Sequence, residues 1–295
     1  MSFSRLVIFG EVLFDCFPDG ARVLGGAPFN VAWHSQAFGL NPLLISRVGN
    51  DPLGEEVRSA MQNWGLDDSG LQLDPAHATG IVDVSFNDGE PSYEIVENSA
   101  WDFIDYQETP EIDEHSVLYH GSLALRNSVA ANSLADLKQQ CSRSIFIDIN
   151  LRPPWWDLSR IQKIMQSGQW IKLNVEELAL IVPQQADIES RIDFLLTNTN
   201  VKLVVVTRGG DGAIAATLDE RCSVLPETIS HVVDTVGAGD AFTSVLLLGL
   251  HKAWPLQEIL NRAQSFASAV VQQRGATTQD KTFYEPFIED WQLQI

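Results

Sequence analysis

Short β-branched runs alternate with amphipathic helical patterns along most of this 295-residue chain, and that alternation limits the folds open to it. An apolar run of a few residues fits a strand buried on both faces, and the patterns between the runs have helical spacing. Such βαβ units imply an α/β fold with a mostly parallel sheet and helices on both faces. We expect strands at residues 6–9, 43–47, 117–119, 144–149, 170–173 and 203–207, and helices at residues 29–38, 54–64, 130–140, 161–166, 176–181 and 188–196.

One region departs from the alternation and has the pattern of a β-hairpin. Residues 80–101 contain two runs in which every second residue is apolar, separated by the turn sequence NDG at residues 87–89. Residues 12–24, interrupted by the sequence PDG, also have the pattern of short strands. One interpretation places this hairpin at the edge of the main sheet.

Charge and composition exclude several classes of protein. The chain carries 39 acidic and 19 basic residues, which disfavours nucleic-acid binding because phosphate backbones require a basic surface. No stretch approaches the roughly 18 to 20 apolar residues that span a bilayer, and the run at residues 6–9 is too short for a signal peptide. Three cysteines far apart in the sequence indicate no disulfide framework. We therefore expect one large α/β domain in the cytoplasm, without nucleic-acid or membrane partners.

The most informative motif is the sequence DTVGAGD at residues 234–240, which is followed at once by a helix that is apolar on almost every face. Gly237 and Gly239 let the backbone approach a ligand, and a helix start presents free N–H groups and a positive dipole end to phosphate oxygens. Asp240 would repel a phosphate, but it suits a base that takes a proton from an attacking hydroxyl. The alternative is that Asp234 and Asp240 only cap the helix. No Walker-type phosphate loop occurs, so the amides of this turn would take its place.

This heptad resembles the second signature of the PfkB, or ribokinase-like, carbohydrate kinases. The sequence GGAPFNVA at residues 25–32 resembles the first signature of the same family. Three further segments are most similar to the bacterial fructokinase-like branch: GEVLFD at residues 10–15, IDINLR at residues 147–152 and NVEE at residues 174–177. The resemblance therefore extends over nearly the whole chain.

The resemblance implies a fold and a reaction. The fold is a ribokinase-like three-layer sandwich over residues 1–295, with a small β-sheet lid over the sugar formed by residues 11–25 and 79–103, approximately. The reaction is ATP-dependent phosphorylation of a sugar, with Mg²⁺ at the phosphates and K⁺ at a monovalent-cation site. Lid strands pair between subunits in this family, so the resemblance also implies a homodimer through the lid.

The resemblance further implies catalytic and sugar-binding residues. Asp240 is the expected general base, and the amides of Gly237, Ala238 and Gly239 are the expected anion hole for charge that grows on the transferred group. Arg152 ends an expected strand, where it would contact the transferred phosphate, and a plain surface arginine is the alternative. The positions that match sugar-binding residues are Asp15, Gly25, Gly26 and Asn30.

Nucleotide and metal positions are implied in the same way. Thr207, Gly209 and Gly212 match a turn beside the nucleotide, although such turns are also common as plain hairpins. Asn174 is expected beside the nucleotide and Glu177 on Mg²⁺ through water. These two residues also have the spacing of a helix capping box, and both interpretations can hold together. The remaining matches are Gly237 and Gly239 beside the nucleotide and Asp234 in the loop of the monovalent-cation site.

The charge of the expected lid bears on the acceptor. An acidic or phosphorylated acceptor needs a cationic clamp, yet residues 80–101 contain no Lys or Arg, and Arg22 is the one cation nearby. A neutral sugar is therefore favoured, and the fructokinase-like motifs predict D-fructose, phosphorylated at a terminal hydroxyl to fructose 6-phosphate. The open alternatives are ribose, 2-keto-3-deoxygluconate or a nucleoside as acceptor, and a non-catalytic sugar or nucleotide sensor on the same fold. The six histidines show no metal or triad spacing, and none is assigned a role.

Overall fold

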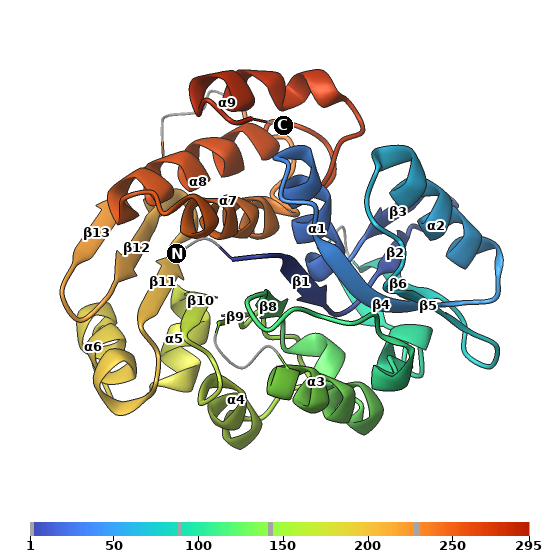
Figure 1. Cartoon of the computed structure of the whole chain (residues 1–295), viewed down its shortest axis with the longest axis horizontal. Helices are drawn as coiled ribbons and strands as arrows, with labels where there is room; N and C mark the ends of the chain where they lie inside the picture. Colours follow the sequence, from blue (N-terminus) through green and yellow to red (C-terminus); the bar gives the residue numbers. More distant parts are fainter. Residues whose placement is uncertain (1–2, 88–89, 141–143, 227–230, 295) are drawn as a thin grey trace.

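The computed structural model describes residues 3–87, 90–140, 144–226 and 231–294, and nine of its strands form one central sheet (Figure 1). These strands are β1 (Leu6–Phe9), β4 (Leu43–Gly49), β5 (Leu71–Asp74), β8 (Val117–His120), β9 (Ile145–Asp148), β10 (Trp170–Asn174), β11 (Leu203–Thr207), β12 (Ala213–Ala216) and β13 (Arg221–Val224). Their spatial order is β13-β12-β11-β10-β9-β8-β1-β4-β5. In this order, every neighbouring pair from β11 to β5 is parallel. β12 pairs antiparallel with both β11 and β13. The expected, mostly parallel sheet is confirmed.

Helices cover both faces of this sheet, as the alternation predicts. The helices are α1 (Ala27–Ala37), α2 (Pro52–Trp64), α3 (Ser128–Gln140), α4 (Leu158–Met165), α5 (Val175–Ile181), α6 (Ile188–Asn198), α7 (Ala238–Lys252), α8 (Leu256–Val270) and α9 (Glu285–Asp290). Helices α1, α7, α8 and α9 lie on one side and α3 to α6 on the other (Figure 1). Each side has its own apolar core, one around Phe29 and Phe266 and the other around Leu134 and Leu178. The result is a three-layer sandwich.

Helix α7 lies inside the first of these cores. Every residue from Ala241 to Gly249 is buried, and α7 packs against both α1 and α8. A helix that is apolar on all sides needs such surroundings, because any side left in water would forfeit its burial energy. No helix in the described ranges is both long and apolar enough to cross a membrane. Burial therefore accounts for the apolar sequence of α7, and it fixes the helix that carries the glycine turn.

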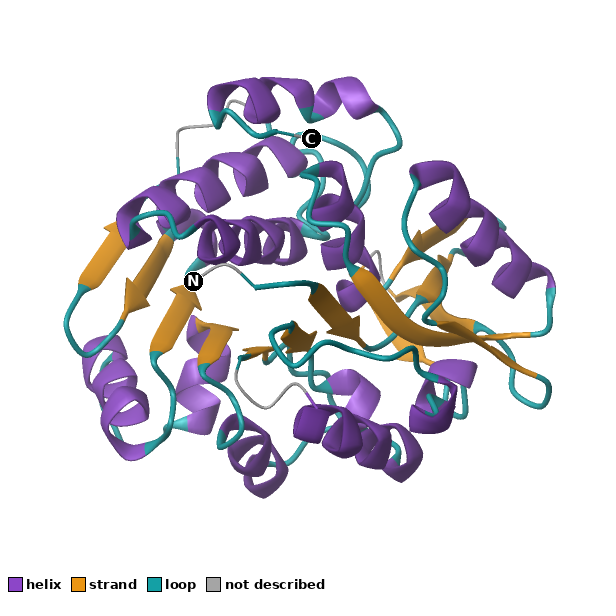
Figure 2. Cartoon of the chain, in the orientation of Figure 1, coloured by secondary structure: helices purple, strands orange, loops and turns teal. Residues whose placement is uncertain are grey.

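A second, smaller sheet stands apart from the first (Figure 2). Its strands are β2 (Leu13–Cys16), β3 (Arg22–Gly25), β6 (Gly80–Asn87) and β7 (Glu90–Ile95), in the spatial order β3-β2-β6-β7. The hairpin expected over residues 80–101 is thus confirmed, but the interpretation that places it at the edge of the main sheet is wrong. Residues 88 and 89 of its turn lie outside the described residues.

The register of the small sheet separates its charges. Asp15 pairs with Val23, and Cys16 pairs with Arg22. Successive side chains of a strand point to opposite faces, so Asp15 and Arg22 lie on opposite faces of the sheet. Arg22 is the first residue of β3.

Three strands of the main sheet were not predicted, namely β5, β12 and β13. β12 has the sequence AIAA, in which alanine has low strand propensity, and β5 is only four residues long at the sheet edge. Their pairing partners, rather than their own composition, hold them in the sheet. The six expected strands are all present, with ends that differ by no more than two residues.

Candidate active site

The first turn of α7 is shaped to receive an anion. Gly237 is the N-cap residue, with φ of 78°, and an added Cβ would lie 2.4 Å from Cβ of Ala276. Glycine is therefore required twice, for the left-handed backbone and for the close approach. The first amides of a helix have no partner within the helix, and a glycine N-cap has no side chain to offer them. These amides and the helix dipole together form a seat for phosphate-like oxygens.

The two signature motifs meet at Asp240. Nδ2 of Asn30, on α1, donates a hydrogen bond of 2.8 Å to Oδ2 of Asp240, on α7. Burial raises the pKa of Asp240 to about 6, although the Asn30 bond and the charge of Lys172 oppose the increase. A carboxylate with this pKa is ionised at neutral pH and is a stronger base than an ordinary aspartate.

The interpretation of Asp234 and Asp240 as caps of α7 does not fit their contacts. Asp234 accepts hydrogen bonds from the amides of Val236, at 3.0 Å, and Gly275, at 3.1 Å. Neither of these amides belongs to α7, and Asp240 accepts from Asn30 instead. Asp234 thus fastens the segment before α7 to the loop at Gly275.

The residues expected to bind the acceptor sugar lie close to one another and to Asp240. A Cβ added to Gly25 would lie 3.9 Å from both Oδ1 of Asn30 and Oδ2 of Asp15, so these two side chains converge beside Gly25. Gly26 has φ of 105°, and a Cβ there would lie 2.7 Å from the carbonyl oxygen of Glu11. The small sheet thereby brings Asp15 to the same site as Asn30 and Asp240.

A buried ionic network that was not predicted packs against the glycine turn on the side of the central sheet. Nζ of Lys172 donates to Oδ1 and Oδ2 of Asp148 at 3.1 and 3.0 Å. Oγ1 of Thr243 lies 2.9 Å from both Oδ2 of Asp148 and the carbonyl oxygen of Gly239. A Cβ on Gly239 would lie 3.2 Å from Nζ of Lys172, so the ammonium group lies directly against the turn.

The charge of this lysine is maintained by its neighbours. Burial alone would lower the pKa of Lys172, but the carboxylates of Asp148 and Asp240 raise it above its ordinary value. The signal was present in the sequence, because Lys172 and Asp148 are charged residues within otherwise apolar strands. Such residues are almost never buried unless they are paired.

Glu11 is a second functional candidate that was not predicted. It is 3% exposed, and its Oε2 has no hydrogen-bond partner among the described residues. Burial raises the pKa of Glu11 to about 7, Arg152 opposes this increase and Asp240 adds to it. A buried carboxylate oxygen without a partner is unusual away from functional sites. Its place in the segment GEVLFD was the only signal in the sequence.

Asn174 and Glu177 form the capping box that their spacing predicts. Oδ1 of Asn174 accepts from the amide of Glu177 at 2.8 Å, and Oε2 of Glu177 accepts from the amide of Asn174 at 2.9 Å. Oε1 of Glu177 also accepts from the amide of Leu151, at 2.7 Å, which ties α5 to the loop that carries Arg152. Among the described residues, no group of three His, Cys, Asp or Glu side chains could hold a metal ion by itself. The Mg²⁺ role of Glu177 stays a prediction.

Arg152 and the turn after β11 border the same edge of the sheet. Arg152 is exposed, and its charge lowers the pKa of Asp240. After Thr207, the turn joins β11 to β12 as an antiparallel hairpin, as the plain-hairpin interpretation expects. A Cβ on Gly212 would lie 1.9 Å from the Val224 carbonyl oxygen, whereas one on Gly209 would meet nothing within 4 Å. Open space at Gly209 leaves room for a ligand, and the nucleotide role of these residues stays a prediction.

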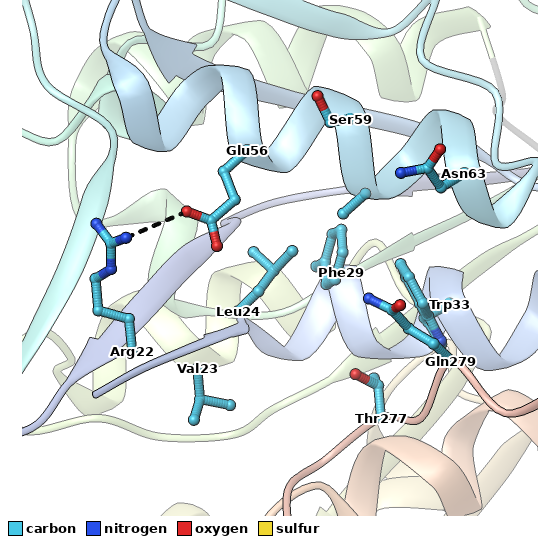
Figure 3. A pocket seen from close by; sticks show the side chains of 11 residues that line it. Arg22, Val23, Leu24, Phe29, Trp33, Glu56, Ser59, Asn63, Thr277 and Gln279 are labelled. Atoms are coloured by element: carbon cyan, nitrogen blue, oxygen red, sulfur yellow. Dashed lines mark ion pairs between the residues drawn. The ribbon is translucent and has the colours of Figure 1, made fainter.

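A cavity of about 440 Å³ lies elsewhere, between β3, α1 and α2 (Figure 3). At its rim Arg22 and Glu56 form an ion pair at 3.5 Å. Asp15, Asn30 and Asp240 are not among the residues that line it. The cavity is therefore separate from the residues expected to bind the sugar. Arg22 is paired with Glu56 of α2 and lies on the face of the small sheet opposite to Asp15.

Comparison with known proteins agrees with the signatures. The model of the pfkB family of carbohydrate kinases matches residues 16–282. The fructokinase of Salmonella typhimurium is 29% identical over 93% of this chain and 95% of its own length. The fructokinase of Klebsiella pneumoniae is 32% identical over 84% of each chain.

Solved structures give the same result. A crystal structure of fructokinase from Vibrio cholerae O395 with fructose, ADP and calcium ion matches with a TM-score of 0.83 and 26% identity, over 97% of this chain and 99% of that one. A double mutant of that enzyme, with fructose, ADP and potassium ion, has the same TM-score and identity, over 96% and 98% of the two chains.

Proposed function

The chain belongs to the pfkB family of carbohydrate kinases, and we propose that it transfers the terminal phosphoryl group of ATP to the terminal hydroxyl of D-fructose, giving fructose 6-phosphate and ADP. The observation that carries this proposal is the bond between Asn30 and Asp240, which joins the acceptor residues to the helix start that can seat a phosphate. The fructokinases of Salmonella typhimurium and Klebsiella pneumoniae, and the Vibrio cholerae enzyme bound to fructose, support the choice of sugar.

Asp240 acts as the general base. Its carboxylate accepts the proton of the attacking hydroxyl while the hydroxyl oxygen forms a bond to the γ-phosphorus. The bond between that phosphorus and the bridging oxygen breaks, and ADP leaves. Such transition states are loose, so the proton is removed late and a pKa near 6 is sufficient.

The amides of Gly237, Ala238 and Gly239 stabilise the charge that spreads over the transferred oxygens. Preorganised donors of this kind act without reorganisation during the reaction. Lys172 lies against the Gly239 backbone and adds a fixed positive charge below the turn. Arg152, exposed at the neighbouring strand end, supplies a second cation toward the transferred group.

The acceptor side favours an uncharged sugar. Asp15 and Asn30 converge beside Gly25, and the carboxylate and amide groups suit adjacent hydroxyls. Arg22 lies on the opposite face of the small sheet and is paired with Glu56. An anionic acceptor would therefore meet the Asp15 carboxylate without a cation from the lid to balance it. We infer that residues 11–25 and 79–103 act as a lid over the sugar.

The nucleotide lies along the carboxyl ends of β10 and β11, at Asn174, Thr207, Gly209 and Gly212. Glu177 would hold Mg²⁺ through water, and the ion would neutralise phosphate charge when bound. The two loops that contain Asp234 and Gly275, joined by the hydrogen bond between these residues, are the seat proposed for K⁺.

The proposal is tested by ADP release, measured over a panel of acceptors with saturating ATP and Mg²⁺. We expect the highest kcat/KM for D-fructose, with ribose, 2-keto-3-deoxygluconate and adenosine far lower. A preference for 2-keto-3-deoxygluconate would refute the charge argument. Nucleotide binding without turnover of any acceptor would instead identify a sensor on this fold.

A further inference from the structure

His34 is buried in the core between α1 and the chain that follows α8. It lies one helical turn after Asn30 and has no exposed surface. Its Nε2 lies 2.9 Å from the carbonyl oxygen of Ala276, and its Nδ1 lies 3.0 Å from Oη of Tyr284. A carbonyl oxygen can only accept, so Nε2 carries the proton and Nδ1 accepts from the tyrosine hydroxyl. Burial lowers the pKa of His34 to about 4, so the ring stays neutral in neutral solution.

The partner of His34 lies directly against the anion seat. A Cβ on Gly237 would lie 2.4 Å from Cβ and 2.5 Å from Cα of Ala276, so these two backbones are in close contact. The loop at Ala276 is fixed at two further points. Oδ2 of Asp234 accepts from the Gly275 amide at 3.1 Å, and Nε1 of Trp33 donates to the carbonyl oxygen of Thr278 at 2.9 Å.

Helix α1 is therefore connected to both halves of the reaction centre. Asn30 binds the Asp240 carboxylate directly, while Trp33 and His34 hold the loop that packs on Gly237. A shift of Ala276 toward Gly237 would displace the Gly237 backbone, and a shift away from it would remove the packing that supports this backbone. Helix α1 thus contacts the start of α7 at two points: Asn30 binds the Asp240 carboxylate, and the loop held by Trp33 and His34 packs on the Gly237 backbone.

We propose that His34 is a positioning residue for phosphoryl transfer, which holds Ala276 against Gly237 and so fixes the backbone of the anion hole. This role rests on the proposed function. It is separate from binding of the sugar, since the side-chain hydrogen bonds of His34 within the described residues go to Ala276 and Tyr284. Misplacement of reacting groups by even 1 Å can reduce a rate up to about a hundredfold, so loss of this bond should lower kcat more than it alters KM.

The test compares three variants. His34→Phe removes both ring nitrogens, while His34→Gln can place an amide N–H where Nε2 was. His120→Phe is the matched control, because His120 is also fully buried and its Nδ1 lies 2.8 Å from a backbone carbonyl oxygen, that of Gly121. We expect His34→Phe to lower kcat about tenfold, with KM for fructose changed less than about twofold, and His34→Gln to recover most of the rate.

A binding measurement keeps the test independent of turnover. Calorimetry with a non-hydrolysable ATP analogue and with ADP should show a loss of about fivefold or more for the analogue alone in His34→Phe, because the anion hole faces the terminal phosphate. Equal kcat and equal nucleotide affinity in His34→Phe, His120→Phe and wild type would overturn the positioning role. If wild type neither binds the analogue nor turns over any sugar, the proposed function itself fails.

Discussion

The two ends of the candidate site are built differently. At the phosphate end, the glycine turn of α7 rests on buried groups, namely Lys172, Asp148 and Ala276, each in close contact with the turn or with one another. At the acceptor end, Asp15 is half-buried on a four-stranded sheet. Val23, which pairs with Asp15 across the strands, is 39% exposed. The glycine turn therefore rests on buried charged and apolar groups, whereas Asp15 stands on a sheet with an exposed neighbouring side chain.

Under the proposed function, this difference separates selection of the acceptor from transfer of the phosphoryl group. On that proposal, changes on the small sheet would alter the contacts with sugar hydroxyls and leave Asp240 and the glycine turn in place. Changes under the glycine turn disturb buried charges and must affect folding as well as catalysis. The following predictions test this division, in order of decreasing effect.

The largest effect is expected for Asp240→Asn. The amide keeps the volume of the side chain and can still accept from Asn30, but it cannot take a proton. We expect kcat for fructose to fall about 10³–10⁴-fold, with the thermal midpoint of unfolding nearly unchanged, measured by ADP release and calorimetry. Activity equal to that of wild type would remove Asp240 as the base.

The next effect concerns Lys172→Met. The change leaves the buried Asp148 carboxylate without its cation, so we expect the free energy of unfolding to fall by about 3 kcal/mol, measured by urea denaturation. Lys138→Met is the matched control, since Lys138 bonds only the Ser167 hydroxyl, at 2.8 Å, among the described residues. Similar losses in the two variants would contradict a special role for the pair below the turn.

Asp15→Ala tests the acceptor end. Loss of a charged hydrogen-bond acceptor for sugar hydroxyls should cost about 2 kcal/mol of binding, or roughly thirtyfold in KM for fructose, with kcat little changed. Steady-state kinetics gives both constants. A fall in kcat without a rise in KM would place Asp15 at the phosphate end and break the division.

The smallest effect is the pH dependence of the wild-type reaction. Protonation of Asp240 removes the base, and its pKa is about 6, so kcat/KM should be constant above that pH and fall about tenfold by pH 5. Glu11 also has a raised pKa, of about 7. Glu11→Gln should retain the fall near pH 6, and a profile without it would transfer the titration to Glu11.

Local patterns predicted the framework of this protein but not the contacts between distant segments. The strands and helices follow from apolar spacing, and the glycine turn and Asn30 follow from the two signatures. Lys172 and Asp148 are 24 positions apart, and His34 and Ala276 are 242 apart. Only the folded chain shows that these residues pack around the same glycine turn, with Lys172 against Gly239 and Ala276 against Gly237. β12 was missed for a related reason, because its alanines are held by pairing with β11 rather than by their own propensity.

The proposed geometry of the site can be checked by a crystal structure of the chain with ADP and D-fructose together. It predicts that the terminal hydroxyl of the sugar lies about 2.6–3.2 Å from the Asp240 carboxylate, with the β-phosphate of ADP directed at the amides of residues 237–239. A sugar found instead in the cavity between β3, α1 and α2, or a nucleotide whose phosphates lie away from the start of α7, would contradict it.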